Sequence, residues 1–367
     1  MWLILPADFI GMRFNDLRVK KIIKETPDSV SIEFEVPEEL KETYNYTPGQ
    51  YLTIKHEING EELRRSYSLC SAPFENQLKI AVKKVNGGKF SSFAVDQLTE
   101  GVELNVMKPM GRFSSAIKTD GAKVLMIAAG SGITPVLSIM KGILKNTSPE
   151  NVTLIYGNRD SNNVIFKNEL DQLESQYACL TVHHVLSREE TTDPANQGRI
   201  DAEKCEDLMS SDNWNMWDEI FICGPEAMIM NVKEHAETKR VDASKIKFEL
   251  FFTAIQEEPR IEEGNEVAGN TNTALSHVTV IVDGEEFEFD LAPDGQNILD
   301  AASDEGADVP FSCKAGVCCT CKAQVLVGEV HMEQNYALEP DDLERGFVLS
   351  CQAHPKTEKV VIDFDVT

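Results

Sequence analysis

The spacing of the cysteines constrains this chain more than any other feature. Four of its nine cysteines lie within the nine-residue stretch CKAGVCCTC, which begins at Cys313. The spacing Cys313-x4-Cys318-x2-Cys321, followed by Cys351 after 29 further residues, is that of plant-type [2Fe–2S] sites. Structural zinc sites usually bring their ligands as paired C-x2–4-C knuckles, and only one such pair is present here. The pattern therefore favours an iron–sulfur cluster, with zinc as the alternative.

Two other residues of this loop have predicted roles. Gly316 lets the loop backbone turn its N–H groups toward the bridging sulfurs, where hydrogen bonds tune the potential. Cys319 is the surplus thiol, and we expect it to point away from the other sulfurs as a small filler.

The charge balance limits the partners. There are 61 Asp and Glu against 35 Lys and Arg, a formal charge of −26, which argues against binding to nucleic acid or an anionic membrane. It suits a protein partner with a basic docking patch, although an acidic surface can also serve solubility alone. The start MWLILPADFIG lacks the basic region and long apolar core of a signal peptide, and we interpret residues 1–11 as a short extension. No run of about eighteen apolar residues occurs, so we predict a cytoplasmic protein.

The sequence pattern divides the chain into four segments. Short alternating runs such as SVSIEFEV and LKIAVKKV predict an antiparallel β-barrel over residues 1–117. Solid apolar runs such as KVLMIAAG and EIFICG, each followed by helix-like sequence, predict a doubly wound α/β domain over 118–253. Residues 254–275 are charged and Gly/Asn-rich, as in a flexible linker on which the last domain could swing. Residues 276–367 begin with a hairpin around Asp283-Gly284 and continue with a short helix, the cysteine loop and a closing strand.

The α/β domain carries two candidate nucleotide signals. The turn Gly130-Ser-Gly132-Ile-Thr134-Pro135 follows a buried strand and precedes a helix, whose free N–H groups can bind a pyrophosphate. Cys223-Gly224-Pro225 ends a second strand and is predicted to flank the nicotinamide, with a small buried hydrophobe as the alternative role of Cys223.

The barrel carries two candidate flavin signals. Arg65-Ser66-Tyr67-Ser68 stands at a strand predicted to begin just after Arg64. Its Arg can neutralise a phosphate, Tyr67 can stack on an isoalloxazine ring, and Ser68 can hydrogen-bond the flavin edge. The run VKKVNGGKFSSF offers further flavin-binding candidates, which are Val82, Lys84, Gly87, Gly88, Phe90 and Ser91. Taken alone, either run would also suit an ordinary strand and loop.

Together these motifs resemble the ferredoxin–NADP reductase superfamily with a C-terminal plant-type ferredoxin of β-grasp fold. RRSYSLCSAP matches the R-x-Y-S flavin motif of that superfamily, and GSGITP and CGP match its nucleotide motifs. The stretch from Cys313 to Pro355 is especially similar to the phenylacetyl-CoA epoxidase reductase family, which passes NAD(P)H electrons to a diiron oxygenase. The resemblance implies four cluster ligands, Cys313, Cys318, Cys321 and Cys351. It also places Glu249 and Phe251 beside the isoalloxazine.

Electron counting orders the predicted cofactors. NAD(P)H delivers two electrons at once and a [2Fe–2S] cluster accepts one, so a flavin belongs between them. The fuller match favours FAD over FMN. Arg159, after the strand VTLIYG, can meet a 2′-phosphate, which favours NADPH over NADH; Arg199 is a second candidate, and Arg159 could instead pair with Asp160. No side-chain acid or base is required for hydride transfer, so we predict no catalytic residue in that sense.

Two classes of function stay open. The first is an electron-transfer oxidoreductase that serves an oxygenase, with a ring-hydroxylating dioxygenase, a desaturase or a hybrid-cluster protein as other acceptors. The second is a redox binding module without turnover. The last domain, from Ser276, holds 19 acidic against 5 basic residues, a local charge of −14 that suits steering onto a basic partner. Asp96, Glu100 and the run EPDDLE (339–344) are interpreted as surface acids.

Overall fold

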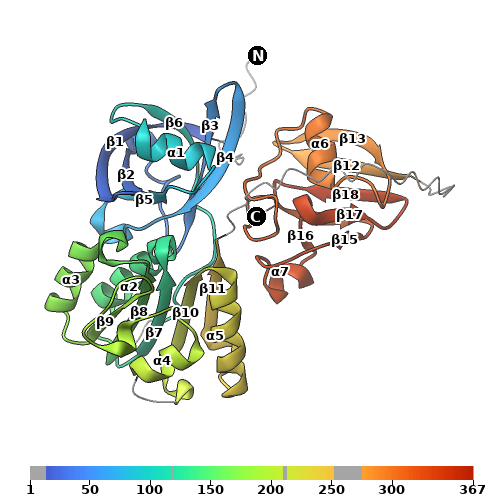
Figure 1. The fold of residues 1–367 in the computed structure, drawn as a ribbon. Helices are drawn as coiled ribbons and strands as arrows, with labels where there is room; N and C mark the ends of the chain where they lie inside the picture. The colour runs from blue at the N-terminus through green and yellow to red at the C-terminus, as the bar shows by residue number, and fades with distance from the viewer. Residues whose placement is uncertain (1–13, 118–119, 210–212, 252–274, 367) are drawn as a thin grey trace, which may run out of the picture. The chain divides into compact units, whose positions relative to one another are not determined.

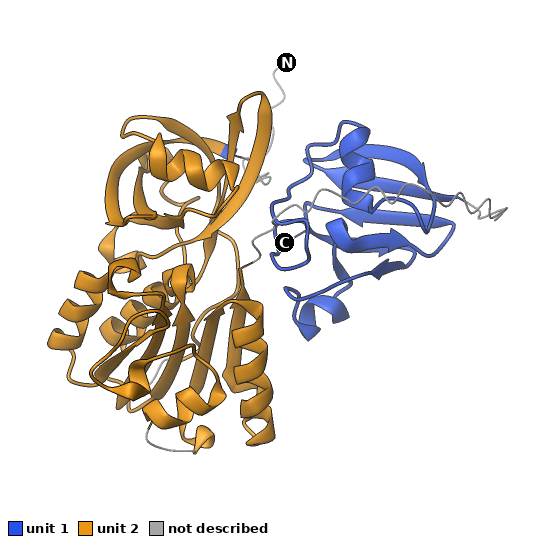
Figure 2. Cartoon of the chain, in the orientation of Figure 1, with its two compact units in different colours: residues 1–14, 252–367 blue, residues 15–251 orange. Residues whose placement is uncertain are grey.

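The chain forms two compact units. The structure is a computed structural model that describes residues 14–117, 120–209, 213–251 and 275–366 (Figure 1). The larger unit comprises Asn15–Phe251, and the described residues of the smaller one are Phe14 and 275–366 (Figure 2). The predicted extension 1–11 and the predicted linker 254–275, apart from Leu275, lie outside the described residues. Residue 118, where the second domain was predicted to begin, lies outside them as well.

The larger unit begins with an antiparallel barrel of six strands. Their order is β4-β3-β6-β1-β2-β5, and a bridge between Leu69 and Ile80 joins the two end strands. Side chains alternate along each strand, so every second residue faces the interior. Apolar residues occupy these inward positions, as Ile32, Ile54 and Ile80 do. The elements are β1 (Phe14–Thr26), β2 (Ser29–Glu35), η1 (Glu38–Leu40), β3 (Tyr51–Ile58), β4 (Glu61–Ser68), η2 (Pro73–Glu75), β5 (Leu78–Lys83), α1 (Lys89–Asp96) and β6 (Glu103–Met107).

A five-stranded parallel sheet follows in the same unit. The strand order is β11-β10-β7-β8-β9, so the chain reverses its direction of winding between β7 and β10. Helices α2 and α3 pack on one face and α4 and α5 on the other. The elements are β7 (Lys123–Ala129), η3 (Gly130–Gly132), α2 (Ile133–Asn146), β8 (Asn151–Asn158), η4 (Ser161–Asn163), α3 (Lys167–Gln176), β9 (Leu180–Leu186), η5 (Pro194–Asn196), α4 (Ala202–Met209), η6 (Trp214–Met216), β10 (Glu219–Gly224), α5 (Glu226–Thr238), η7 (Ala243–Lys245) and β11 (Ile246–Leu250).

The barrel and the parallel sheet share one apolar core. Cys70, Ala81 and Phe113 of the barrel side pack in the same cluster as α2 and the sheet residues that face it. Phe113 meets Phe221 of β10 edge-on, with ring centroids 5.5 Å apart. This shared core explains why Asn15–Phe251 behaves as a single compact unit although its two halves have different folds.

The smaller unit is an α+β domain of the predicted kind. Its main sheet has the order β13-β12-β18-β14-β16, in which β12 and β18 are parallel, and β15 and β17 form a separate pair. The predicted turn has φ of 52° at Asp283 and 75° at Gly284, as a primed hairpin turn requires. The elements are β12 (Ser276–Val282), β13 (Glu285–Leu291), α6 (Ile298–Asp304), β14 (Lys322–Val327), β15 (Val330–Met332), α7 (Pro340–Glu344), β16 (Phe347–Leu349), η8 (Ser350–Gln352), β17 (Ala353–Pro355) and β18 (Lys359–Asp363).

Two expectations about local structure were wrong. Strand β4 begins at Glu61, so the RSYS residues close this strand instead of opening it; β4 is held from its first residue by its pairing with β3. Asp342 is fully buried and not a surface acid, because its Oδ2 accepts the Glu339 N–H at 3.3 Å as a helix cap. The Lys322 ammonium lies 3.4 Å from the other carboxylate oxygen and compensates its charge.

Candidate functional site

The four predicted ligand sulfurs gather in the smaller unit as two pairs. Cys318 Sγ donates to Cys313 Sγ at 3.1 Å, and the thiols of Cys321 and Cys351 are hydrogen-bonded to each other. Cys321 and Cys351 are buried, whereas Cys313 and Cys318 are half-buried. In the described residues, no group of three or more His, Cys, Asp or Glu side chains is arranged for a single ion. Two pairs of thiols match the need of a two-iron cluster for four cysteines.

The loop backbone points N–H groups toward the Cys313 sulfur. Gly316 has φ of +70°, a conformation that L side chains rarely adopt, and the Ala315 N–H points to Cys313 Sγ at 3.3 Å. The hydrogen bond from Cys318, helped by backbone N–H groups of residues 315, 317 and 318, lowers the pKa of Cys313 to about 6. Cys313 is thereby favoured as the thiolate, the ligand form of cysteine, whereas the neighbouring thiols and burial raise the pKa of Cys318 and Cys321. Cys319 is turned elsewhere, and its thiol donates to the Ala337 carbonyl at 3.1 Å.

The predicted flavin strand ends at the boundary between the two halves of the larger unit. Arg65 is exposed and its guanidinium donates to its neighbour's carbonyl, the Arg64 oxygen, at 2.8 Å. Ser66 shares a hydrogen bond of 3.0 Å with Thr53 on β3. The ring of Tyr67 lies 5.6 Å from that of Phe90, tilted by 34°. Tyr67 is thus held by an aromatic neighbour that comes from the second predicted flavin run.

That second run forms a tight turn at the start of α1. Gly87 has φ of +75°, and Gly88 is the N-cap residue of the helix. A Cβ on Gly88 would lie 2.5 Å from Ser91 Oγ, and that hydroxyl accepts the Val85 N–H at 3.1 Å. The first N–H groups of α1 therefore follow two glycines, which have no side chains to block an approaching ligand. This arrangement suits an anion such as a diphosphate.

Three side chains of this second run, those of Val82, Lys84 and Phe90, are held by contacts within the protein. Val82 is fully buried in the barrel core, and Phe90 is buried beside Tyr67. Lys84 forms an ion pair with Asp96 at the other end of α1. For Val82 and Phe90, any flavin contact consistent with this placement is through the backbone.

The glycine turn of the sheet lies at its topological switch. Gly130 has φ of +56°, and a Cβ on Gly132 would overlap the Cys223 carbonyl of β10. Thr134 Oγ1 donates to the Ser131 carbonyl at 3.0 Å, and Pro135 is buried in the first turn of α2. Gly132 is thus needed for the close approach of α2 and β10. Ligands of open α/β sheets bind at this kind of switch point, outside the carboxyl ends of the strands.

Ser68, Glu249 and Cys223 meet at the same place. Ser68 Oγ donates to Glu249 Oε2 at 3.1 Å, and Cys223 is the register partner of Glu249 across β10 and β11. Burial raises the pKa of Glu249 to about 7, and the Ser68 hydrogen bond opposes this shift. Burial, and secondly the charge of Glu249, raise the pKa of Cys223 well above its usual value. Cys223 is therefore a neutral thiol, while Glu249 can hold or release a proton near neutral pH.

Gly224 and Pro225 complete this strand end. A Cβ on Gly224 would lie 2.8 Å from the Met228 methyl group, and Pro225 is the N-cap residue of α5. Phe251 is half-buried and packs against the shared core. Gly224, like Gly132, leaves no room for a side chain at this end of the sheet.

The end of β8 holds a residue that the sequence did not single out. The Asn158 amide is buried beside the Tyr156 hydroxyl, to which it is hydrogen-bonded, and that hydroxyl donates to the Gly130 carbonyl at 3.0 Å. Asn158 therefore ties the end of β8 to the glycine turn through Tyr156. Its position directly before Arg159, at a strand's carboxyl end, was the available signal.

Arg159 and Arg199, the predicted phosphate ligands, are both exposed. Asp160 does not pair with Arg159, because its carboxylate accepts from the Asn162 N–H at 3.0 Å and from the Asn163 amide. The Arg159 carbonyl accepts the Arg188 N–H at 2.8 Å, which brings a third arginine to the ends of β8 and β9.

These features define a class of protein, an oxidoreductase with a flavin barrel, a pyridine-nucleotide domain and an iron–sulfur domain. Three family models match it: the oxidoreductase FAD-binding domain over 16–115, the oxidoreductase NAD-binding domain over 126–234 and the 2Fe-2S iron-sulfur cluster binding domain over 280–356. Among the described residues, no helix is both long and apolar enough to cross a membrane.

Two relatives are similar over almost the whole chain. A component of the 1,2-phenylacetyl-CoA epoxidase of Escherichia coli K12 is 42% identical over 96% of this chain and 98% of that protein. The ferredoxin reductase component of 3-ketosteroid-9-alpha-monooxygenase from Rhodococcus rhodochrous is 34% identical, with the same coverage of both chains. This chain belongs to their family of flavin- and iron–sulfur-containing reductase components.

Solved structures agree in fold. Phthalate dioxygenase reductase superimposes with a TM-score of 0.57 at 24% identity, over 95% of this chain and 98% of that one. An intact type IV self-sufficient cytochrome P450 monooxygenase gives 0.67 at 18% identity, over 95% of this chain and 41% of that one. The predicted fold class, family, oxidoreductase activity and the FAD and [2Fe–2S] cofactors are confirmed.

Proposed function

We propose that this chain is the reductase component of a phenylacetyl-CoA epoxidase, and that it takes electrons from NADPH. The observation that carries the electron-transfer part is the meeting of Ser68, from the flavin barrel, with Glu249 and Cys223, from the nucleotide sheet. The acceptor follows from the 42% identity with the Escherichia coli epoxidase component, which extends over nearly the full length of both chains.

The residues of the larger unit would bind and orient two cofactors. Tyr67 and Ser68 would contact the isoalloxazine, Arg65 a phosphate, and the Gly87–Gly88 turn the diphosphate of FAD. Gly130, Gly132 and the start of α2 would receive the pyrophosphate of the coenzyme. When bound, FAD takes two electrons together from the nicotinamide and releases them singly to the cluster.

The side chains at the meeting point would control water and protons. Cys223 is fully buried and neutral, so it would shield the nicotinamide from water without contributing charge. Glu249, with a pKa of about 7, would hold a proton on its carboxyl group and would accept a hydrogen bond from the Ser68 hydroxyl at Oε2. Ser68 itself is buried and would be oriented by that hydrogen bond.

The four cysteines would hold the cluster in the smaller unit, with Cys313 and Cys318 as one pair and Cys321 and Cys351 as the other. The local charge of −14 in this unit supports an acceptor whose docking patch is basic. Electron transfer to that acceptor should then slow as salt screens the attraction, most strongly between about 0.05 and 0.5 M.

For the coenzyme, Arg159 supports NADPH. It is exposed at the carboxyl end of β8, and its carboxylate neighbour Asp160 is engaged with Asn162 and Asn163. A guanidinium here can pair with the 2′-phosphate that distinguishes NADPH from NADH.

Reconstituted turnover tests the acceptor. We expect the purified holoprotein to support NADPH-dependent epoxidation of phenylacetyl-CoA by a phenylacetyl-CoA epoxidase oxygenase component. The oxygenase component of a 3-ketosteroid-9-alpha-monooxygenase is the matched control, and we expect at least tenfold less turnover with it. Equal or better turnover with the control would contradict the proposed acceptor and leave the reductase chemistry standing.

A further inference from the structure

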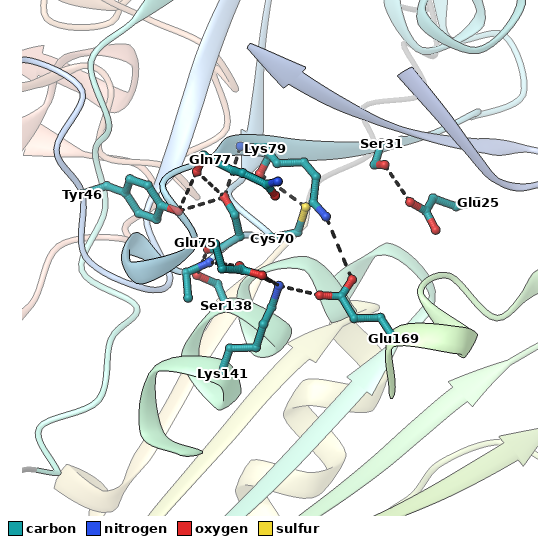
Figure 3. Close-up of polar contacts among 12 residues, drawn as sticks. Glu25, Ser31, Tyr46, Cys70, Glu75, Gln77, Lys79, Ser138, Lys141 and Glu169 are labelled. Atoms are coloured by element: carbon teal, nitrogen blue, oxygen red, sulfur yellow. Dashed lines mark hydrogen bonds and ion pairs between the residues drawn. The ribbon is translucent and has the colours of Figure 1, made fainter. Parts of the chain in front are cut away.

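Four alternating charges form a line across the boundary between barrel and nucleotide sheet. Lys141 Nζ lies 2.8 Å from Glu75 Oε2 and 2.6 Å from Glu169 Oε1, and Glu169 Oε2 lies 4.0 Å from Lys79 Nζ (Figure 3). We call these four residues the charge clasp. Its order is Lys79, Glu169, Lys141, Glu75.

The clasp crosses the boundary twice. Glu75 in η2 and Lys79 in β5 belong to the barrel, whereas Lys141 in α2 and Glu169 in α3 belong to the nucleotide sheet. A neutral contact runs beside it: Ser138 Oγ of α2 donates to the Ser71 carbonyl at 2.6 Å.

Lys141 occupies an unusual environment for its type. Its side chain is 3% exposed, although lysine is rarely buried at all. Glu75 is also tied to its own loop, because its Oε2 accepts the Ala72 N–H at 2.6 Å. Buried ion pairs contribute little to stability compared with apolar side chains of similar size, because desolvation offsets the attraction. Such a pair can instead fix one arrangement of the elements that carry it.

Two short segments of the chain connect the charge clasp with the proposed cofactor site. Lys141 is about two and a half turns along α2 from Gly132, the last residue of the glycine turn, and a helix is a rigid connection. On the barrel side, the loop from Leu69 to Glu75 continues directly from Ser68, the last residue of the flavin strand. The same helix also approaches the barrel closely at Gly142, where a Cβ would lie 3.0 Å from the Pro48 ring.

We propose that Lys141 is a positioning residue for hydride transfer. By tying Glu75 of the barrel to α2, it sets the register between the nucleotide turn and the end of β4, and so the approach of nicotinamide to flavin. This inference rests on the proposed function of the larger unit. It predicts an effect on the limiting rate of flavin reduction, not on the binding of either cofactor.

The test uses the full-length holoprotein and the double variant Glu75→Gln, Lys141→Met. This variant removes one charge of each sign, leaves Glu169 with Lys79, and retains a side-chain oxygen for the Ala72 N–H. Four quantities are measured: flavin content, melting temperature, the Kd for NADPH and the limiting rate of flavin reduction in stopped flow. Hydrogen exchange of residues 69–77 in the coenzyme-free protein is an independent readout of the clasp.

We expect flavin content and Kd to stay within twofold of the wild type and the melting temperature within a few degrees. The limiting rate should fall about tenfold or more, since small misplacements of reacting atoms have large effects on rate. Exchange of residues 69–77 should be faster. Lys167→Met, which breaks the exposed Lys167–Asp171 pair within α3, is the matched control and should change none of these quantities.

Three comparisons decide the matter. A wild-type limiting rate in the double variant would overturn the proposal. If Lys141→Met alone also lost that rate, the unpaired Glu75 carboxylate would be the cause of the loss, and the clasp itself would not set the rate. If the double variant did not fold, Glu75→Gln alone would still have to lower the limiting rate while Lys141 keeps Glu169. A wild-type protein that NADPH does not reduce would instead refute the proposed function.

Discussion

Ser68 Oγ donates a 3.1 Å hydrogen bond to Glu249 Oε2, and this contact joins the last residue of flavin strand β4 to the edge strand β11 of the nucleotide sheet. The two residues are 181 positions apart in the chain. Burial raises the pKa of Glu249 to about 7, so its protonation changes in the physiological range.

Replacing Glu249 should change how stability depends on pH. A carboxyl whose pKa is raised by folding stabilises the fold below its unfolded pKa, and this stabilisation is lost as pH rises through about 7. Between pH 4.5 and 7.5, the unfolding free energy of the wild type should fall on the order of 1–3 kcal/mol further than that of Glu249→Gln. Thermal unfolding of the flavin-free proteins across this range measures it. Parallel stability curves for the two proteins would show that Glu249 ionises normally.

Substitutions of the adjacent Cys318 and Cys319 should show which of the two is a cluster ligand. Cys318→Ser should abolish the visible iron–sulfur absorbance, because it removes one sulfur of the Cys313 pair. Cys319→Ser should retain it, since that thiol bonds the Ala337 carbonyl instead. In both variants NADPH should still reduce the flavin. Loss of the cluster in Cys319→Ser alone would reverse the ligand assignment.

Gly132→Ala should damage the nucleotide domain. The added Cβ would overlap the Cys223 carbonyl, which is backbone and cannot move aside without shifting β10. We expect a loss of about 1–3 kcal/mol of unfolding free energy and weaker coenzyme binding. Ser131→Ala in the same turn is the control and should be near neutral. Unchanged stability and NADPH affinity in Gly132→Ala would contradict the close approach.

Arg159→Ala should act on one coenzyme only. If Arg159 pairs with the 2′-phosphate, the KM for NADPH should rise about 10- to 100-fold, as expected for a charge-assisted contact, with little change for NADH. Arg199→Ala, measured in the same way, tells which arginine is responsible. An equal effect of Arg159→Ala on both coenzymes would remove the argument for NADPH.

The sequence predicted the parts of this protein better than their contacts. The cysteine spacing and the GSGITP turn have short-range physical reasons, namely loop closure around iron and a helix start, and both could be located by inspection. The RSYS run was assigned to a strand, but it closes β4 instead of opening it. Lys141 shows the limit, because a lysine within an α-helix is expected to face solvent and its two carboxylate partners come from distant segments.

Burial was the other property that local pattern could not provide. Asp342 was interpreted as a surface acid because it stands in an acidic run, yet Lys322 and a helix cap hold it inside. The environment of the Asn158 amide likewise depends on how β8 packs against its neighbours. Such residues depend on long-range packing, which only the folded chain defines.

The measurement that tests the central claim most directly is an anaerobic absorbance titration of the purified full-length protein, first with NADPH and then with NADH. We predict that flavin and iron–sulfur bands both bleach at low micromolar NADPH, which would establish the electron path from coenzyme to cluster in one experiment. A protein that binds FAD and iron but whose bands resist both coenzymes would contradict the account, and a redox binding module without turnover would take its place.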